Sequence, residues 1–250
     1  MRKIKDIFDQ SIIEKKLLFD LPFRIALIGR SGSGKTNVLI NLLDKEMYGK
    51  DFKKDDIYII TGSLSTDDKI KNYVKKRNIP LENLYNGYKE DEMSELYNIL
   101  STNYKISISE NSKPAHSLVI FDDISFSGAL NDTRNGIMDK FACNSRKFLV
   151  SMISTAQKYT QLSTCIRENL TGLICASCSD RQLDIISEDF NYTGCKKTFR
   201  MMFRDLTNNK FTFFICNLSN KKKDIYMDSN FEPICICKGE KSCKNKIINC

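Results

Sequence analysis

Short apolar runs alternate along most of the chain with segments in which apolar residues recur every three or four positions. The apolar runs predict buried β-strands at residues 24–28, 57–61, 117–122, 148–154 and 173–177. The amphipathic segments predict helices after the first run and near residues 66–77, 91–101, 132–143, 162–169 and 180–190. Because alternating strands and helices are typical of βαβ units, we expect an α/β fold with a central, mainly parallel sheet flanked by helices.

The pattern changes near the end of the chain, where two apolar segments follow each other closely. We expect strands at 199–206 and 211–218, joined by the turn sequence TNNK in a C-terminal β-hairpin. Residues 1–22 carry apolar positions that fit a short amphipathic helix. The predicted organisation is therefore a helical lead-in at 1–22, one domain at 23–218, and a basic, cysteine-containing tail at 219–250.

Composition indicates a globular chain, since 41% of its 250 residues are hydrophobic and 28% are charged. The formal net charge of +8 is concentrated near the end, where twelve cations and five anions lie from Phe190 onward. A basic C-terminal quarter suits a polyanion such as DNA, and a lysine-rich solubilising surface would explain the same charge.

The first twenty residues are charged throughout and lack the apolar core of a signal peptide. No run approaches the roughly 18 apolar residues that a membrane-spanning helix needs. We therefore expect no membrane partner and an intracellular location. Ten cysteines without a secretion signal predict reduced thiols rather than a disulfide framework.

The most specific motif, GRSGSGKT, follows the first predicted strand and precedes an amphipathic segment. It fits the phosphate-loop pattern G-x-x-x-x-G-K-[ST] in its proper strand-to-helix context. The glycines let backbone N–H groups approach phosphate oxygens, the lysine ammonium reaches the β- and γ-phosphates, and the threonine hydroxyl suits Mg²⁺. We predict that ATP and Mg²⁺ bind here, with the nucleotide held by Gly29, Arg30, Ser31, Gly32, Ser33, Gly34, Lys35 and Thr36.

A second motif is LVIFDD, in which a buried strand ends in two aspartates. A phosphate loop needs a carboxylate for its metal ion, and Asp122 at the strand end is the candidate, together with Thr36. Asp123 is the candidate general base that polarises an attacking water. The alternative is that Asp123 caps the next helix or pairs with a lysine.

Two further polar residues follow the later strands. Gln157 comes just after the strand at 148–154 and could orient the same water or sense the γ-phosphate; a solvated loop glutamine is the other interpretation. Arg167 precedes the strand at 173–177 and could reach a neighbouring subunit's nucleotide as an arginine finger; a surface arginine is the alternative.

The order of GRSGSGKT, LVIFDD, a strand ending near a glutamine, and R-x-N before another strand resembles the genome-packaging ATPases of large DNA viruses and virophages. These belong to the FtsK/HerA group of P-loop translocases. The resemblance covers about residues 23–218 and implies a strand order 5-1-4-3-2, a homo-oligomeric ring, and ATP-driven movement of double-stranded DNA. It also implies capsid or portal-vertex partners, and a location in the host cytoplasm or virus factory, or in association with the virion.

Carried over by position, the resemblance gives Lys35, Asp123, Gln157 and Arg167 the catalytic roles and Asp122 the metal role. Two departures stand out: much of the wider group has glutamate where this chain has Asp123, and Arg146 stands where relatives often have a Gly-Arg-His run. Arg146 is therefore considered only as a DNA contact.

Three classes of function stay open from the sequence. The first is a DNA-translocating ATPase. The second is a small nucleotide kinase, which would usually have an arginine-rich lid that we do not find. The third is an ATP-binding assembly protein with little turnover. The tail cysteines Cys235, Cys237, Cys243 and Cys250 could bind zinc, but they lack C-x₂-C spacing and fit a basic tail with incidental thiols.

Overall fold

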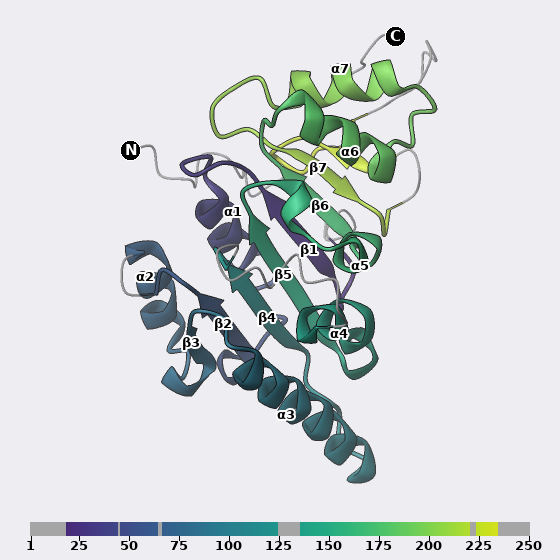
Figure 1. Ribbon diagram of the computed structural model, residues 1–250. Helices are drawn as coiled ribbons and strands as arrows, with labels where there is room; N and C mark the ends of the chain where they lie inside the picture. The colour runs from purple at the N-terminus through teal and green to yellow at the C-terminus, as the bar shows by residue number, and fades with distance from the viewer. Residues whose placement is uncertain (1–18, 45, 65–66, 125–135, 221–223, 235–250) are drawn as a thin grey trace.

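The computed structural model describes residues 19–44, 46–64, 67–124, 136–220 and 224–234 (Figure 1). They form an eight-stranded sheet with the order β3-β2-β4-β5-β1-β6-β7-β8. The strands are β1 Arg24–Ile28, β2 Ile57–Thr61, β3 Leu84–Asn86, β4 Ser117–Asp122, β5 Val150–Ala156, β6 Gly172–Cys175, β7 Phe214–Asn217 and β8 Tyr226–Met227. The predicted lead-in and the tail cysteines fall largely or wholly outside the described residues.

The predicted core topology is confirmed. The five strands expected from the sequence are β1, β2, β4, β5 and β6, and they pair in parallel in the order β6-β1-β5-β4-β2. This is the order 5-1-4-3-2 when those strands are numbered along the chain. The three-residue strand β3 extends the β2 edge in parallel, and sequence patterning did not predict it.

Helices cover both faces of the sheet, so its central strands are buried on both sides. The helices are α1 Lys35–Leu42, α2 Asp68–Arg77, α3 Glu90–Ser109, α4 Ile137–Asn144, α5 Thr164–Glu168, α6 Asp180–Phe190 and α7 Lys196–Leu206. Apolar residues of α1 and α2 pack in one core cluster, and those of α3 to α7 pack in the other, across the sheet. Successive strand residues contribute alternately to the two clusters, as the pleat requires.

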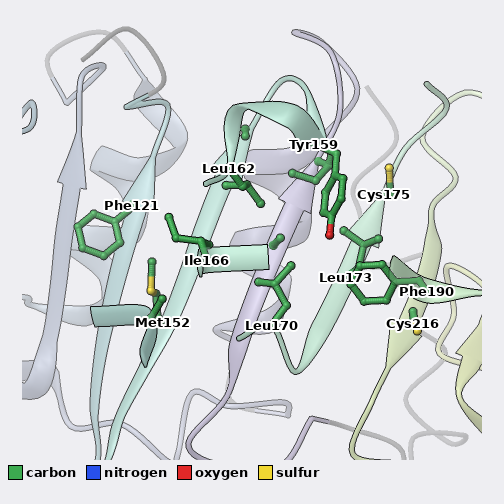
Figure 2. Close-up of a cluster of buried hydrophobic side chains, with 14 of the residues drawn as sticks. Phe121, Met152, Tyr159, Leu162, Ile166, Leu170, Leu173, Cys175, Phe190 and Cys216 are labelled. Carbon is green, nitrogen blue, oxygen red and sulfur yellow. The ribbon is translucent and has the colours of Figure 1, made fainter. Parts of the chain in front are cut away.

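The larger cluster joins helices and strands that are far apart in the sequence. Figure 2 shows Phe121 and Met152 from β4 and β5, Ile166 from α5, and Leu173 and Phe190 from β6 and α6 within it. Each of these side chains is at most 2% exposed. The connection between β5 and β6 is thus packed against the sheet on the same face as α6.

The prediction of a strand at 199–206 is wrong, because this segment is helix α7. Phe199, Met202, Phe203 and Leu206 are buried at helical spacing, whereas Met201 is 46% exposed. A C-terminal β-hairpin is present, but it is formed by β7 and β8, which pair antiparallel. Because β8 lies at Tyr226–Met227, the sheet continues past residue 218; the domain boundaries at 22 and 218 stay predictions.

Helix α3 is also longer than predicted, because it continues through the sequence TNYKISIS as far as Ser109. Its last two turns contain exposed Ile106 and Ile108, so its burial pattern ends before the helix does. Among the described helices, none is long and apolar enough to span a bilayer.

Candidate nucleotide-binding site

The phosphate loop leaves the carboxyl end of β1, near the middle of the sheet. The Gly29 N–H donates to the Ala156 carbonyl of β5 over 3.1 Å, which fixes the start of the loop. Gly34 occupies the N-cap of α1 with φ 99°, a conformation that favours glycine. The N-terminus of α1 therefore points its free N–H groups and positive dipole end toward the loop, as anion binding requires.

The loop is too closely folded for a side chain at its first glycine. A Cβ at position 29 would lie 2.5 Å from Ser33 Oγ and 2.9 Å from Ala176 Cβ. The Ser33 hydroxyl is buried, and it has no hydrogen-bond partner among the described residues. A compact cradle with an unused buried donor fits a phosphate-binding loop.

Lys35 lies across this cradle. Its Nζ donates to the Gly29 carbonyl over 2.6 Å and to the Arg30 carbonyl over 3.3 Å. Burial lowers the pKa of Lys35, and the negative charges of Asp123 and Asp122 act in the opposite direction. The ammonium and both aspartates are thus electrostatic neighbours, as joint action on a γ-phosphate requires.

Asp122 is buried at the end of β4 and is 4% exposed. Its Oδ1 accepts a 2.8 Å hydrogen bond from Thr155 Oγ1, and its Oδ2 a longer one of 3.5 Å from Thr61 Oγ1. Burial raises the pKa of Asp122, and the hydrogen bond from Thr155 partly offsets this effect. A buried carboxylate held by hydroxyls is a hard oxygen ligand in a fixed position.

Asp123 has a different environment. Its backbone has φ 51°, and its N–H donates to Thr155 Oγ1 over 3.0 Å. The residue is half-buried, and its carboxylate makes no ion pair within the described part of the chain. The next described helix, α4, has Gly136 at its N-cap, so Asp123 does not cap it. The two adjacent aspartates therefore differ, since Asp122 is buried with a hydrogen-bonded carboxylate and Asp123 is half-buried at a left-handed position.

Gln157 lies between the phosphate loop and the acid pair along the sheet edge. Strand β5 separates β1 from β4, and Ile28 pairs with Ala156 immediately before Gln157. The Gln157 N–H and the Lys158 N–H both donate to Gln161 Oε1, at 3.0 and 2.9 Å. The Gln157 backbone is thereby anchored at the same edge as Gly29 and Asp122.

The contacts of Arg167 do not include the phosphate loop, the two aspartates or Gln157. Its guanidinium pairs with Asp189 at 3.3 Å, donates to Thr164 Oγ1, and lies 5.5 Å from the centroid of the Tyr159 ring. The Arg167 side chain is 21% exposed. The finger role stays a prediction, and it would require the Asp189 pair to open.

The family of the chain follows from comparison with known proteins. The model of the family described as Poxvirus A32 protein matches residues 10–243. The chain belongs to this family. No curated protein matches the A32-family chain.

Solved structures confirm the fold of the A32-family chain. It superposes on the genome-packaging NTPase B204 of Sulfolobus turreted icosahedral virus 2, in complex with AMP, with a TM-score of 0.56 and 14% identity. That match covers 80% of this chain and 95% of B204. The conjugation coupling protein TcpA of pCW3 matches with a TM-score of 0.50 and 16% identity, over 78% of this chain and 57% of TcpA. The sequence-based recognition of a P-loop NTPase fold is thereby confirmed.

The residues of the A32-family chain fit a Mg²⁺-nucleotide. Asp122 and the Thr36 hydroxyl are the oxygen ligands that would hold the ion, which would neutralise charge on the β- and γ-phosphates when bound. The fit rests on the hard donor set and on the cradle around Gly29, which side-chain atoms would otherwise fill.

Sequence reasoning missed one central group of the A32-family site, the Thr155 hydroxyl. It accepts from the Asp123 N–H and donates to the Asp122 carboxylate, so one side chain fixes both acids. Its signal in the sequence was a threonine at the end of a buried strand, which is ordinary strand composition. Only the register of β4 against β5 shows what it does.

Proposed function

We propose that this P-loop ATPase hydrolyses ATP to move double-stranded DNA into a viral capsid. The observation that carries the proposal is the pair of adjacent aspartates, both hydrogen-bonded to Thr155. The negative charges of both aspartates raise the pKa of Lys35 against the effect of burial. The A32-family membership and the fold shared with a genome-packaging NTPase support the DNA-packaging part.

Each residue has a separate task in the proposed reaction. Loop N–H groups and Lys35 bind the phosphates, so Lys35 must exchange its contacts with the Gly29 and Arg30 carbonyls for phosphate oxygens. Asp122 and Thr36 hold the metal ion. Asp123, half-buried and outside any described ion pair, accepts the proton of the attacking water, and Gln157 orients that water.

The proposal includes a homo-oligomeric ring around the DNA, docking on capsid or portal-vertex proteins, and action in the host cytoplasm or virus factory. In such a ring, Arg167 of one subunit would approach the nucleotide of the next. Mixing Arg167→Ala subunits with Lys35→Ala subunits tests this role. Recovery of turnover in the mixture supports action in trans, whereas no recovery at any ratio contradicts it.

The deciding experiment measures ATP hydrolysis with and without duplex DNA in the wild type, Lys35→Ala and Asp123→Asn. We expect stimulation by DNA in the wild type only. Asp123→Asn should keep ATP binding and lose turnover by about 100-fold or more, because a positioned base contributes about 10²–10⁴ in rate.

Other outcomes identify the competing functions. A wild-type rate that DNA does not change, combined with label transfer from ATP to a nucleoside monophosphate, would indicate a kinase. Tight ATP binding with negligible turnover, unchanged in Asp123→Asn, would indicate a nucleotide-gated assembly protein. Either result would overturn the translocase proposal.

A further inference from the structure

The segment that leads into β7 places an exposed aromatic ring beside the phosphate loop. A Cβ at Gly34 would lie 3.2 Å from Phe211 Cδ1 and 3.8 Å from Phe213 Cζ. Phe213 is buried, with 4% exposure, whereas Phe211 is 46% exposed. Two aromatic residues therefore approach the start of α1, and one of them presents its ring to solvent.

The backbone at Phe211 is unusual for such a residue. Its φ of 66° is in the left-handed region, which bulky side chains rarely adopt. The neighbouring backbone is anchored, since the Phe213 N–H donates to Ser229 Oγ over 2.6 Å and Ser229 Oγ donates back to the Phe213 carbonyl over 3.2 Å. A strained, exposed aromatic residue beside an anchored segment is typical of a functional position.

The sheet topology gives Phe211 a defined place relative to the catalytic groups. Ile28 pairs with Cys175 of β6, and Cys175 pairs with Phe214 of β7, so residues 211–213 lie at the same sheet edge as the phosphate loop. The acid pair lies on the other side of β1, beyond β5. The phosphate loop is therefore between Asp122–Asp123 and Phe211.

A nucleotide bound in this loop has one possible polarity. Lys35 and the acid pair must face the γ-phosphate, so the α-phosphate, ribose and base extend toward the opposite side of the loop. That side holds Phe211. We propose that the Phe211 ring is the platform on which the base of the bound nucleotide stacks.

The local chemistry suits this role. The Lys210 ammonium lies over the Phe211 ring, 4.9 Å from its centroid, so this face is covered by a long surface side chain, which a stacked base would replace. A planar base can occupy a ring face by offset stacking. Stacking reads no hydrogen-bonding edge, so Phe211 contributes affinity for purine nucleotides without selecting adenine over guanine.

The inference rests on the proposed function only in requiring that the loop bind a nucleotide, and a binding experiment separates the two. The chain contains no tryptophan, so Phe211→Trp introduces a single tryptophan into the full-length protein, and its emission can be excited selectively over that of the ten tyrosines. We expect ATP, GTP and ADP to quench its emission and inorganic tripolyphosphate, which competes for the loop but has no base, to leave the emission nearly unchanged. Equal responses to ATP and tripolyphosphate would overturn the proposal.

Tyr192→Trp is the matched control, because Tyr192 is exposed to a similar extent, 48%. It follows the last turn of α6, whereas the first turn of this helix is the one that follows β6 at the sheet edge with the phosphate loop. Its emission should not respond to ATP. In a second measurement, Phe211→Ala should weaken ATP and GTP binding about tenfold, leave tripolyphosphate binding unchanged, and be rescued by Phe211→Tyr. Equal loss for tripolyphosphate would mean that Phe211 only shapes the loop, and no loss would exclude stacking.

The two hypotheses can fail separately. If the wild type binds ATP with the expected dependence on Phe211 but does not hydrolyse it, the stacking platform stands and the translocase proposal fails. If DNA stimulates hydrolysis and Phe211→Ala changes neither the Kd for ATP nor the KM, the platform is wrong and the proposed function is unaffected.

Discussion

At the scale of single residues, one hydroxyl connects the two adjacent aspartates of the candidate site, for which we propose different roles. Replacing Thr155 with valine keeps the shape of the side chain but removes the donor to Asp122 and the acceptor for the Asp123 N–H. We expect a loss of about 1–3 kcal/mol in the free energy of unfolding, because buried partners are left unsatisfied. Turnover should fall at least about tenfold, and the Mg²⁺ concentration for half-maximal activity should rise.

Thr155→Ser is the control for that experiment, because it restores the hydroxyl while changing the packing by one methyl group. Calorimetry and a Mg²⁺ titration of the ATPase rate should place it near the wild type. If serine and valine behave alike in both measurements, the hydroxyl does not hold the acid pair.

Asp122 illustrates a conflict between stability and function. Its pKa is raised by burial, so between the usual aspartate pKa and the raised value the folded state binds more protons than the unfolded state. Stability contributed by this group is therefore present at low pH and lost as pH rises through that window. Asp122→Asn removes the titration, and we expect its Tm to exceed that of the wild type by a margin that grows toward neutral pH.

The same Asp122→Asn variant should have no measurable Mg²⁺-dependent turnover. Asp123→Asn, at the half-buried neighbour, should change Tm less than Asp122→Asn while also losing turnover. Thermal melts of the three proteins from pH 4 to pH 8 test the difference. A margin that is constant across this range, or a less stable Asp122→Asn at neutral pH, would contradict the burial argument.

How much of the site was predictable depends on whether its residues act through local sequence. Lys35, Thr36 and Asp122 could be named as candidates from the sequence, because a phosphate-loop motif and the end of a buried strand mark them, and their roles stay predictions. Thr155 depends on the register between β4 and β5, and Phe211 on an antiparallel pairing of β7 with β6. Pairing partners cannot be read from the periodicity of one strand, so these two residues required the structure.

At the scale of elements, α7 shows where periodicity was misread. The segment TFRMMFRDL contains aromatic residues that favour strands, but its apolar positions recur every three or four residues. In a strand, Met201 would share a face with Phe199 and Phe203; in the helix, it points to solvent while Met202 is 1% exposed. Tertiary burial of this stripe against β7 decided the outcome.

This assignment yields a direct test of α7. Met202→Ala should destabilise the protein by about 2–5 kcal/mol, because it leaves a cavity beneath the helix. Met201→Ala should change the free energy of unfolding by less than about 0.5 kcal/mol. Urea unfolding of the two variants makes the comparison. A large loss in Met201→Ala would favour the strand with Met201 on the same face as Phe199 and Phe203.

At the scale of the whole molecule, the structure refines the meaning of the basic C-terminal quarter. Lys196 and Arg200 pair with Asp184, and Arg200 and Arg204 pair with Asp180, so helices α6 and α7 neutralise part of their own charge. These three cations are poorly suited to bind DNA without breaking ion pairs. The other nine cations from Phe190 onward include Lys238, Lys241, Lys244 and Lys246, which lie outside the described residues.

The final prediction tests whether those lysines provide the contact with DNA. Replacing Lys238, Lys241, Lys244 and Lys246 with glutamine should weaken duplex binding and reduce the slope of log Kd against log salt. The slope should fall by about 0.9 for each lysine that contacts a phosphate, because each contact releases condensed counterions. The ATPase rate without DNA should not change, since the phosphate loop and the acid pair are intact.

A matched variant separates local contacts from net charge. Lys69, Lys71, Lys75 and Lys76 are exposed on α2, and replacing them with glutamine removes an equal number of positive charges. Of these four, Lys71 is in an exposed ion pair with Asp68 at 3.6 Å. If the tail lysines contact DNA, only the first variant loses salt dependence and DNA-stimulated turnover. Equal losses in both variants would show that the overall field of the +8 protein attracts DNA, and that the C-terminal quarter holds no dedicated phosphate contacts.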